Sequence, residues 1–149
     1  MRIANICTHD VVHVDADLSV RDAAQLMRKQ HVGTLVVVDQ PNGERIPIGI
    51  VTDRDIVVSV IAADADADTL SVGDIMTRQL ATCTESEELF DAVQTMRTRG
   101  VRRLPVLDRN GGLAGLLSAD DIFVALSMHL NDLSHALARE QIHEMETRS

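Results

Sequence analysis

Apolar and polar residues follow each other along this chain in a pattern that predicts short strands and amphipathic helices. Two apolar runs, Thr34–Val38 and Ile46–Val51, flank the turn sequence Pro41-Asn42-Gly43. β-Branched runs of this length are typical of buried strands, so the turn predicts an antiparallel hairpin. Before the hairpin, apolar residues recur at helical spacing behind a capping serine, which predicts a helix over Ser19–Lys29.

The hairpin has a strand and helix before it and another helix behind it. We expect the strand at Val11–Val14 and the second helix at about Asp53–Ala62. Thr52 and Asp55 have the spacing of a capping box, in which both side chains bind free backbone N–H groups at a helix start. Gly49 allows the backbone to pack or turn closely at this point. The unit therefore reads strand, helix, strand, strand, helix.

This unit occurs twice. The layout of Gly49–Ile56 recurs 66 residues later in Gly115–Ile122, and the positions before the hairpin turn match at an offset of 69. The offset changes because the first hairpin turn is three residues longer than the second. Matched pairs include Ile3 with Val72, Ile6 with Ile75, Thr8 with Thr77, Asp22 with Asp91, Met27 with Met96, and Asp39 with Asp108.

The second copy predicts its own set of elements. Ser71 and Asp74 open a short helix, and the rest of the copy reads as a strand near Ala81–Cys83, a helix at Glu88–Thr98, and a hairpin of Leu104–Leu107 with Leu113–Leu117. Each unit leaves one sheet face uncovered, so the two should pack sheet to sheet around a pseudo-two-fold axis. The predicted fold class is α+β, with two tandem β-α-β-β-α units at 1–66 and at 67–128, and the acidic connector Ala63–Asp68 lies at their junction.

A long helix is predicted after the second hairpin, from Asp120 into a tail at 129–149. Its apolar stripe consists of Ile122, Leu126, Leu130, Leu133, Leu137 and Met145. An overhanging amphipathic helix packs either on its own domain or on a partner subunit, and the sequence favours neither.

Composition narrows the classes of function. The net charge of −9 argues against sequence-independent binding to nucleic acid or to anionic membranes, because both depend on clustered Lys and Arg. The longest apolar runs are far shorter than the roughly 20 residues that span a bilayer, and Met1 is followed by no apolar signal segment, so we expect a cytoplasmic protein. Cys7 and Cys83 form no disulfide framework, and reduced thiols agree with that location.

Candidate catalytic and metal-binding patterns are weak. Asp64, Asp66 and Asp68 start like a calcium loop, but Thr69 replaces the turn glycine and Ile75 stands where the bidentate glutamate belongs. We interpret the six histidines as surface or cap residues, and we find no Ser–His–Asp or Cys–His arrangement and no phosphate loop of the GxxxxGK type. We therefore expect no catalytic residues, no metal site and no enzyme activity.

The duplicated strings carry a family resemblance. Thr52-Asp53-Arg54-Asp55-Ile56 and Val101-Arg102-Arg103-Leu104-Pro105-Val106 are the most characteristic, and each copy ends in Gly-x-x-Thr/Ser-x-x-Asp-Ile. From Ile3 to about Met128 the chain resembles a tandem pair of CBS (cystathionine β-synthase) domains. We expect no attached output domain, and the chain in this respect resembles the stand-alone members.

The resemblance implies a regulatory, energy-sensing module that binds an adenine nucleotide in a cleft between the copies. By position, Asp55 and Asp121 would bind ribose, while Thr52 and Ser118 would bind phosphate. Arg54, Arg102 and Arg103 are the candidate cations for that phosphate, since the planar guanidinium binds phosphate oxygens in pairs. The chain has no Trp or Tyr, so the base should lie between aliphatic side chains, its edge read by backbone groups near His13 and Cys83.

The expected ligand is AMP, ADP, ATP, NAD or S-adenosylmethionine, none of them a required cofactor. The expected assembly is a homodimer that passes the ligand state to a regulated protein. The alternative is a dimeric interaction scaffold without nucleotide, in which the two Thr/Ser–Asp pairs are capping boxes only. A third hypothesis is nucleic-acid binding through the three arginines. Asp120 stands in the second copy where Arg54 stands in the first, which predicts one site that is empty or takes a less charged ligand.

Overall fold

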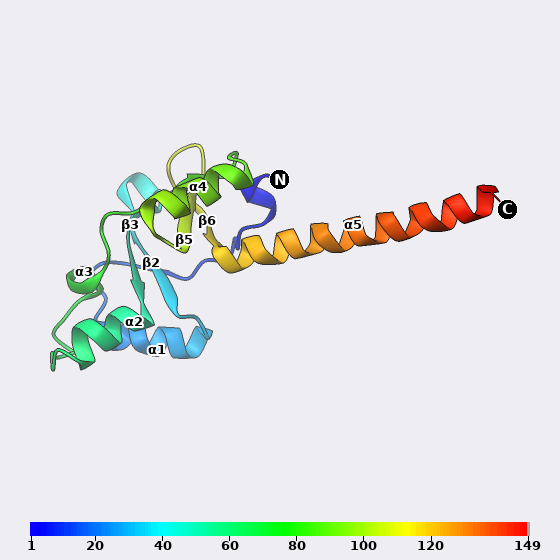
Figure 1. Ribbon diagram of the computed structural model, residues 1–149. Helices are drawn as coiled ribbons and strands as arrows, with labels where there is room; N and C mark the ends of the chain where they lie inside the picture. The colour runs from blue at the N-terminus through cyan, green and yellow to red at the C-terminus, as the bar shows by residue number, and fades with distance from the viewer. Residues whose placement is uncertain (149) are drawn as a thin grey trace.

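Two three-stranded sheets form the centre of the protein, one from each copy of the repeat (Figure 1). The computed structural model describes residues 1–148. In each sheet the first strand is parallel to the second, and the second is antiparallel to the third. The strands are β1 (His13–Val14), β2 (Thr34–Asp39) and β3 (Ile46–Thr52) in one sheet, and β4 (Cys83–Thr84), β5 (Arg103–Leu107) and β6 (Leu113–Ser118) in the other.

The helices follow the order expected from the repeat. In the first copy α1 (Val20–Gln30) precedes the hairpin, and α2 (Asp53–Ile56) follows it and continues as a π-helical turn, η3 (Val57–Ile61). The second copy has α4 (Leu89–Arg99) and the long α5 (Ala119–Arg148) in the same places. Three short helices complete the set: η1 (Ile3–Asn5), η2 (Pro41–Gly43) and α3 (Val72–Ile75).

The predicted α+β fold with two β-α-β-β-α units is confirmed, with one difference in the first strands. Each of them has only two residues and starts later than expected, at His13 and at Cys83. The residues just before them line pockets between the two halves.

Both faces of β2 are buried, which shows how the halves pack. Leu35 and Val37 belong to the hydrophobic cluster that contains Ala23 and Met27 of α1. Side chains alternate along a strand, so Val36 and Val38 point to the opposite face, yet they are fully buried too. The other half of the molecule must cover that face, which confirms the predicted sheet-to-sheet packing.

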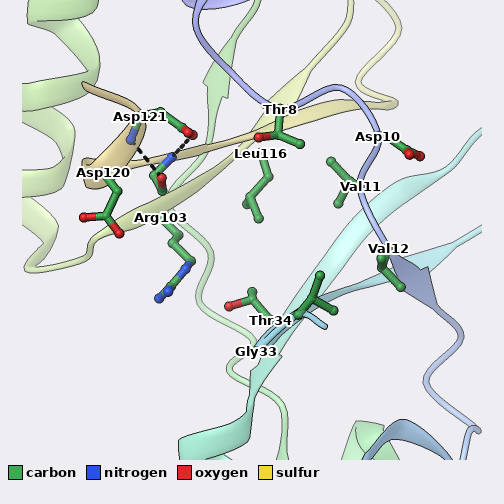
Figure 2. A pocket seen from close by; sticks show the side chains of 12 residues that line it. Thr8, Asp10, Val11, Val12, Gly33, Thr34, Arg103, Leu116, Asp120 and Asp121 are labelled. Carbon is green, nitrogen blue, oxygen red and sulfur yellow. Dashed lines mark hydrogen bonds between the residues drawn. The ribbon is translucent and has the colours of Figure 1, made fainter. Parts of the chain in front are cut away.

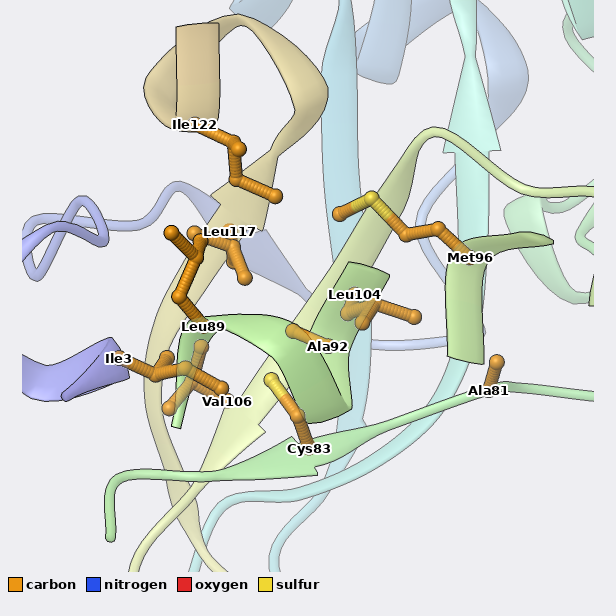
Figure 3. Close-up of a cluster of buried hydrophobic side chains, with 10 residues drawn as sticks. All are labelled: Ile3, Ala81, Cys83, Leu89, Ala92, Met96, Leu104, Val106, Leu117 and Ile122. Atoms are coloured by element: carbon orange, nitrogen blue, oxygen red, sulfur yellow. The ribbon is translucent and has the colours of Figure 1, made fainter. Parts of the chain in front are cut away.

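The start of each copy packs into the core of the other copy. Ile3 is fully buried in the second cluster, where Figure 3 shows it beside Leu89 and Val106. In the same way, Val72 and Met76 from the start of the second copy belong to the first cluster. The core of each copy is therefore completed by the first segment of the other copy.

The last helix begins on the body and then leaves it (Figure 1). Its buried residues are Ile122 and Ala125, and every described residue after Ala125 is exposed. The tail therefore does not pack on its own domain, which was one of the two expectations. Exposed apolar residues in this part include Leu126, Leu130, Leu133, Leu137, Ile142 and Met145.

Candidate functional site

Two pockets lie where the start of one copy meets the hairpin end of the other. The Ser118 pocket has a volume of about 270 Å³ and is lined by residues within 8–12, 32–34 and 116–121, together with Arg103 (Figure 2). The Thr52 pocket has the same volume and is lined by residues within 50–52, 77–81 and 101–103. The three segments of one pocket are the repeat equivalents of the three segments of the other, so the pseudo-two-fold axis relates the two pockets.

Backbone pairing between the copies builds both pockets. Ile50 and Thr77 exchange two main-chain hydrogen bonds of 3.1 and 2.9 Å. Their repeat equivalents Leu116 and Thr8 exchange two of 2.9 and 3.0 Å. Each leading segment is thereby held beside the last strand of the opposite sheet, next to the helix start that carries the hydroxyl and carboxylate.

The Thr/Ser–Asp pairs form capping boxes in both copies. The Asp55 Oδ2 atom accepts from the Thr52 N–H at 2.8 Å, and the Thr52 hydroxyl oxygen accepts from the Asp55 N–H at 3.2 Å. Ser118 and Asp121 make the same two bonds at 2.9 and 3.1 Å. Thr52 and Ser118 each line a pocket, and Asp121 lines the Ser118 pocket; Asp55 is half-buried in α2, beside the lining of the Thr52 pocket rather than in it.

The predicted arginines divide into two groups. Arg103 lines both pockets, and Arg102 lines the Thr52 pocket. The Arg102 guanidinium also lies 3.7 Å from a carboxylate oxygen of Asp120, which lines the Ser118 pocket; both side chains are largely exposed. Arg54 is exposed on α2 and lines neither pocket.

His13 and Cys83 lie inside the strands rather than in the pockets. A ring nitrogen of His13 is 3.3 Å from the Val11 carbonyl oxygen, and the Cys83 thiol donates to the Pro105 carbonyl oxygen at 3.9 Å. Burial raises the pKa of the Cys83 thiol to about 12, so it is a neutral core group. The residues two or three positions earlier, Val11 and Leu80, do line the pockets.

Sequence reasoning missed the leading segments as pocket residues. Thr8 and Asp10 line the Ser118 pocket, and their repeat equivalents Thr77 and Gln79 line the Thr52 pocket. The match of Thr8 with Thr77 was a visible signal, but nothing in the local sequence shows that these residues reach the opposite sheet.

Metal and membrane features were searched in residues 1–148. They contain no group of three or more His, Cys, Asp or Glu side chains arranged to hold a metal ion. Asp68 of the acidic connector instead pairs with Arg21 of α1. None of the described helices combines the length and apolar character needed to cross a bilayer.

The sequence matches a known family over both repeats. A family model for the CBS domain matches residues 3–62 and 72–128. Protein MK0525 of Methanopyrus kandleri is 32% identical over 120 residues, which are 80% of this chain and 60% of that protein. The chain thus spans less than two thirds of that relative.

Solved structures of similar proteins have the same fold. A hexameric CBS-CP12 protein from bloom-forming cyanobacteria is 30% identical with a TM-score of 0.71, covering 83% of this chain and 69% of that one. The CBS domain protein PAE2072 from Pyrobaculum aerophilum, solved in complex with AMP, is 26% identical with a TM-score of 0.72, covering 81% of this chain and 89% of that one.

Proposed function

Because this chain belongs to the CBS domain family, we propose that it is a regulatory module that binds an adenine nucleotide between its two repeats. The observation that carries the proposal is the pair of pseudo-symmetric pockets, each with a helix-start hydroxyl and the Arg103 guanidinium in its lining. The AMP complex of the Pyrobaculum protein supports the ligand class.

The Thr52 pocket has the groups that a nucleotide requires. Arg102 and Arg103 supply two guanidinium groups for the phosphate, since Arg binds phosphate oxygens in pairs. The Thr52 hydroxyl oxygen accepts a backbone N–H, which leaves its own hydrogen free to bond to a phosphate oxygen. Ile50, Leu80 and Val101 form apolar walls for the base, and the neighbouring Asp55 carboxylate is the proposed acceptor for the ribose hydroxyls.

The regulatory output is proposed to pass through a dimer of this chain. Leu126, Leu130, Leu133 and Leu137 are exposed on α5 and recur at spacings of four, three and four residues, which is the seam of a coiled coil. The positions that flank this seam are Ser127, His129, Ser134 and Ala136, so two copies can pair without repulsion between Lys, Arg, Asp or Glu. The hexamer formed by the cyanobacterial relative shows that a chain with this fold can self-associate.

Calorimetric titration of purified protein with AMP, ADP, ATP, NAD and S-adenosylmethionine tests the proposal. We expect at least one of these to bind, and Thr52→Ala to weaken the binding while Thr98→Ala, an exposed threonine on α4, leaves it unchanged. Because the Thr52 cap contributes about 1 kcal/mol of stability, each variant is checked for folding by circular dichroism. A folded wild-type protein that binds none of the five compounds contradicts the proposal.

The exposed seam on α5 also favours a second candidate, an interaction scaffold that needs no nucleotide. A scaffold would keep its dimer and its partner in the Thr52→Ala variant. It would also show no absorbance peak at 260 nm after nucleic acid is removed. A nucleotide retained by the purified protein would show that peak clearly, because the chain has no Trp or Tyr.

A further inference from the structure

The two pockets are related by the repeat, yet their linings carry opposite formal charge. The Thr52 pocket contains Arg102 and Arg103 and no carboxylate, so its lining has a formal charge of +2. The Ser118 pocket contains Asp10, Asp120 and Asp121 beside Arg103, so its lining has a formal charge of −2. Figure 2 shows Asp120 and Asp121 on one side of that pocket and Asp10 on the other.

The difference arises at positions that correspond in the two copies. Asp10 in the Ser118 pocket corresponds to Gln79 in the Thr52 pocket, and Gly33 corresponds to Arg102. The apolar walls are similar, because Val32 and Leu116 correspond to Val101 and Ile50. The two pockets therefore offer similar room for a base and ribose but opposite environments for a phosphate.

Arg103 lines both pockets and is the cation in the lining of the Ser118 pocket. A phosphate bound beside Thr52 would attract its guanidinium together with that of Arg102. The negative charge of the three carboxylates in the Ser118 pocket would then be less neutralised. A second phosphate in that pocket would be repelled by these like charges at short range.

We propose that the Thr52 pocket takes the phosphate-bearing nucleotide, whereas the Ser118 pocket takes a nucleoside that carries no phosphate. The inference rests on the proposed function, because it assigns ligand classes to the same two pockets. The apolar walls and the Ser118 hydroxyl bind the uncharged part of the ligand, and the carboxylates of Asp10 and Asp120 reject anions and accept hydroxyl donors.

Calorimetry with AMP and adenosine tests this assignment. We expect wild-type protein to bind one AMP per chain, and protein saturated with AMP to bind one adenosine per chain. Arg102→Ala should weaken AMP roughly tenfold or more and weaken adenosine binding in the Ser118 pocket far less, because Arg102 lines the Thr52 pocket and reaches the Ser118 pocket only through its exposed ion pair with Asp120.

A charge-removing variant gives the converse result. Asp10→Gln with Asp120→Asn brings the formal charge of the Ser118 lining from −2 to 0, and a second AMP per chain should then bind. The control is Asp17→Asn with Asp132→Asn, which makes the same change in net charge at two exposed residues outside both linings. It should still bind one AMP.

Two results would overturn the assignment while leaving the proposed function intact. One is two equivalent AMP sites in the wild-type chain. The other is a folded Asp10→Gln/Asp120→Asn protein that still binds one AMP. If folded wild-type protein binds neither AMP nor adenosine, the assignment of the two pockets is wrong. Titration with ADP, ATP, NAD and S-adenosylmethionine then decides whether the proposed function fails as well.

Discussion

Ile50 and Thr77 exchange two main-chain hydrogen bonds across the boundary between the repeats, and Leu116 and Thr8 do the same on the other side of the pseudo-two-fold axis. The two copies are therefore joined by an exchange of their leading segments. This exchange completes both hydrophobic cores, and it also forms one wall of each pocket.

The exchange predicts that the first residues of the chain stabilise the second repeat. Ile3→Ala removes a fully buried side chain from the second core and should lower the free energy of unfolding by about 2–5 kcal/mol. Val58→Ala is the control, because Val58 is exposed and its truncation should change stability by about 0.5 kcal/mol or less. Urea unfolding followed by circular dichroism measures both. Equal stability of the two variants would show that the first segment is not part of the second core.

Two matched glycines should differ in their tolerance of alanine. A Cβ atom on Gly115 would lie 2.8 Å from the Thr8 carbonyl oxygen, and this backbone is fixed by the exchange. A Cβ atom on Gly49 would lie 3.1 Å from the corresponding Thr77 carbonyl oxygen, and its closer neighbours belong to the Met76 side chain, which can move. Gly115→Ala should therefore cost about 1–3 kcal/mol, and Gly49→Ala less, in thermal unfolding. The reverse order would contradict this explanation.

The ends of α1 and α4 predict a stabilising substitution. His31 and Gly100 occupy equivalent C-cap positions with φ of 56° and 65°, in the left-handed region that favours glycine. His31→Gly should therefore raise the free energy of unfolding by several tenths of a kcal/mol to about 1 kcal/mol. Gly100→Ala is the converse variant and should lower it by a similar amount. If His31→Gly lowers the free energy of unfolding, the contacts of the His31 side chain stabilise the fold by more than its left-handed backbone conformation costs.

The two thiols should react at very different rates. Burial raises the pKa of the Cys83 thiol to about 12, whereas Cys7 is half-buried and its pKa is raised, mainly by burial. A thiol reagent at pH 8 should modify Cys7 slowly and Cys83 only when the protein unfolds, since the thiolate is the nucleophile. Mass spectrometry after timed quenching distinguishes the sites. Fast modification of Cys83 in folded protein would contradict its place in the core.

The same pKa shift predicts a pH dependence of stability. The folded pKa of Cys83 lies above its ordinary value of 9.0, so the unfolded chain loses its thiol proton first as the pH rises. The contribution of Cys83 is therefore fully present below about pH 9 and decreases between about pH 9 and 12. Cys83→Ala should remove this part of the alkaline loss, which chemical unfolding at pH 8 and pH 10.5 can measure. If Cys83→Ala loses as much unfolding free energy between pH 8 and pH 10.5 as the wild-type protein, other groups cause the loss.

The seam on α5 predicts a dimer that a charge can break. Leu130→Lys with Leu133→Lys places two charges in the apolar stripe and should convert a dimer into a monomer in light-scattering chromatography. Asn131→Lys with His135→Lys adds the same charge at positions away from the seam and its flanking residues, and should leave the dimer intact. A monomeric wild-type protein at micromolar concentration would contradict the proposed dimer.

The repeat, the hairpins and most helix starts follow from local sequence. Capping pairs such as Thr52 with Asp55 act over three residues, and apolar periodicity acts over one or two turns, so both can be recognised without tertiary structure. The sequence also indicated Thr52, Ser118, Arg102 and Arg103, each of which lines a pocket. Their roles in binding remain proposals that the titrations above will test.

Tertiary structure decided which segments meet. Thr8 pairs with Leu116, far along the chain, and no local pattern in either residue specifies that partner. For this reason Asp10 and Gln79 were not recognised as pocket residues, and Arg54 was placed with the phosphate although it lies outside both linings. Periodicity and capping are properties of neighbours in sequence, whereas a cavity depends on which distant surfaces cover each other when apolar area is buried, and only the packed chain fixes that.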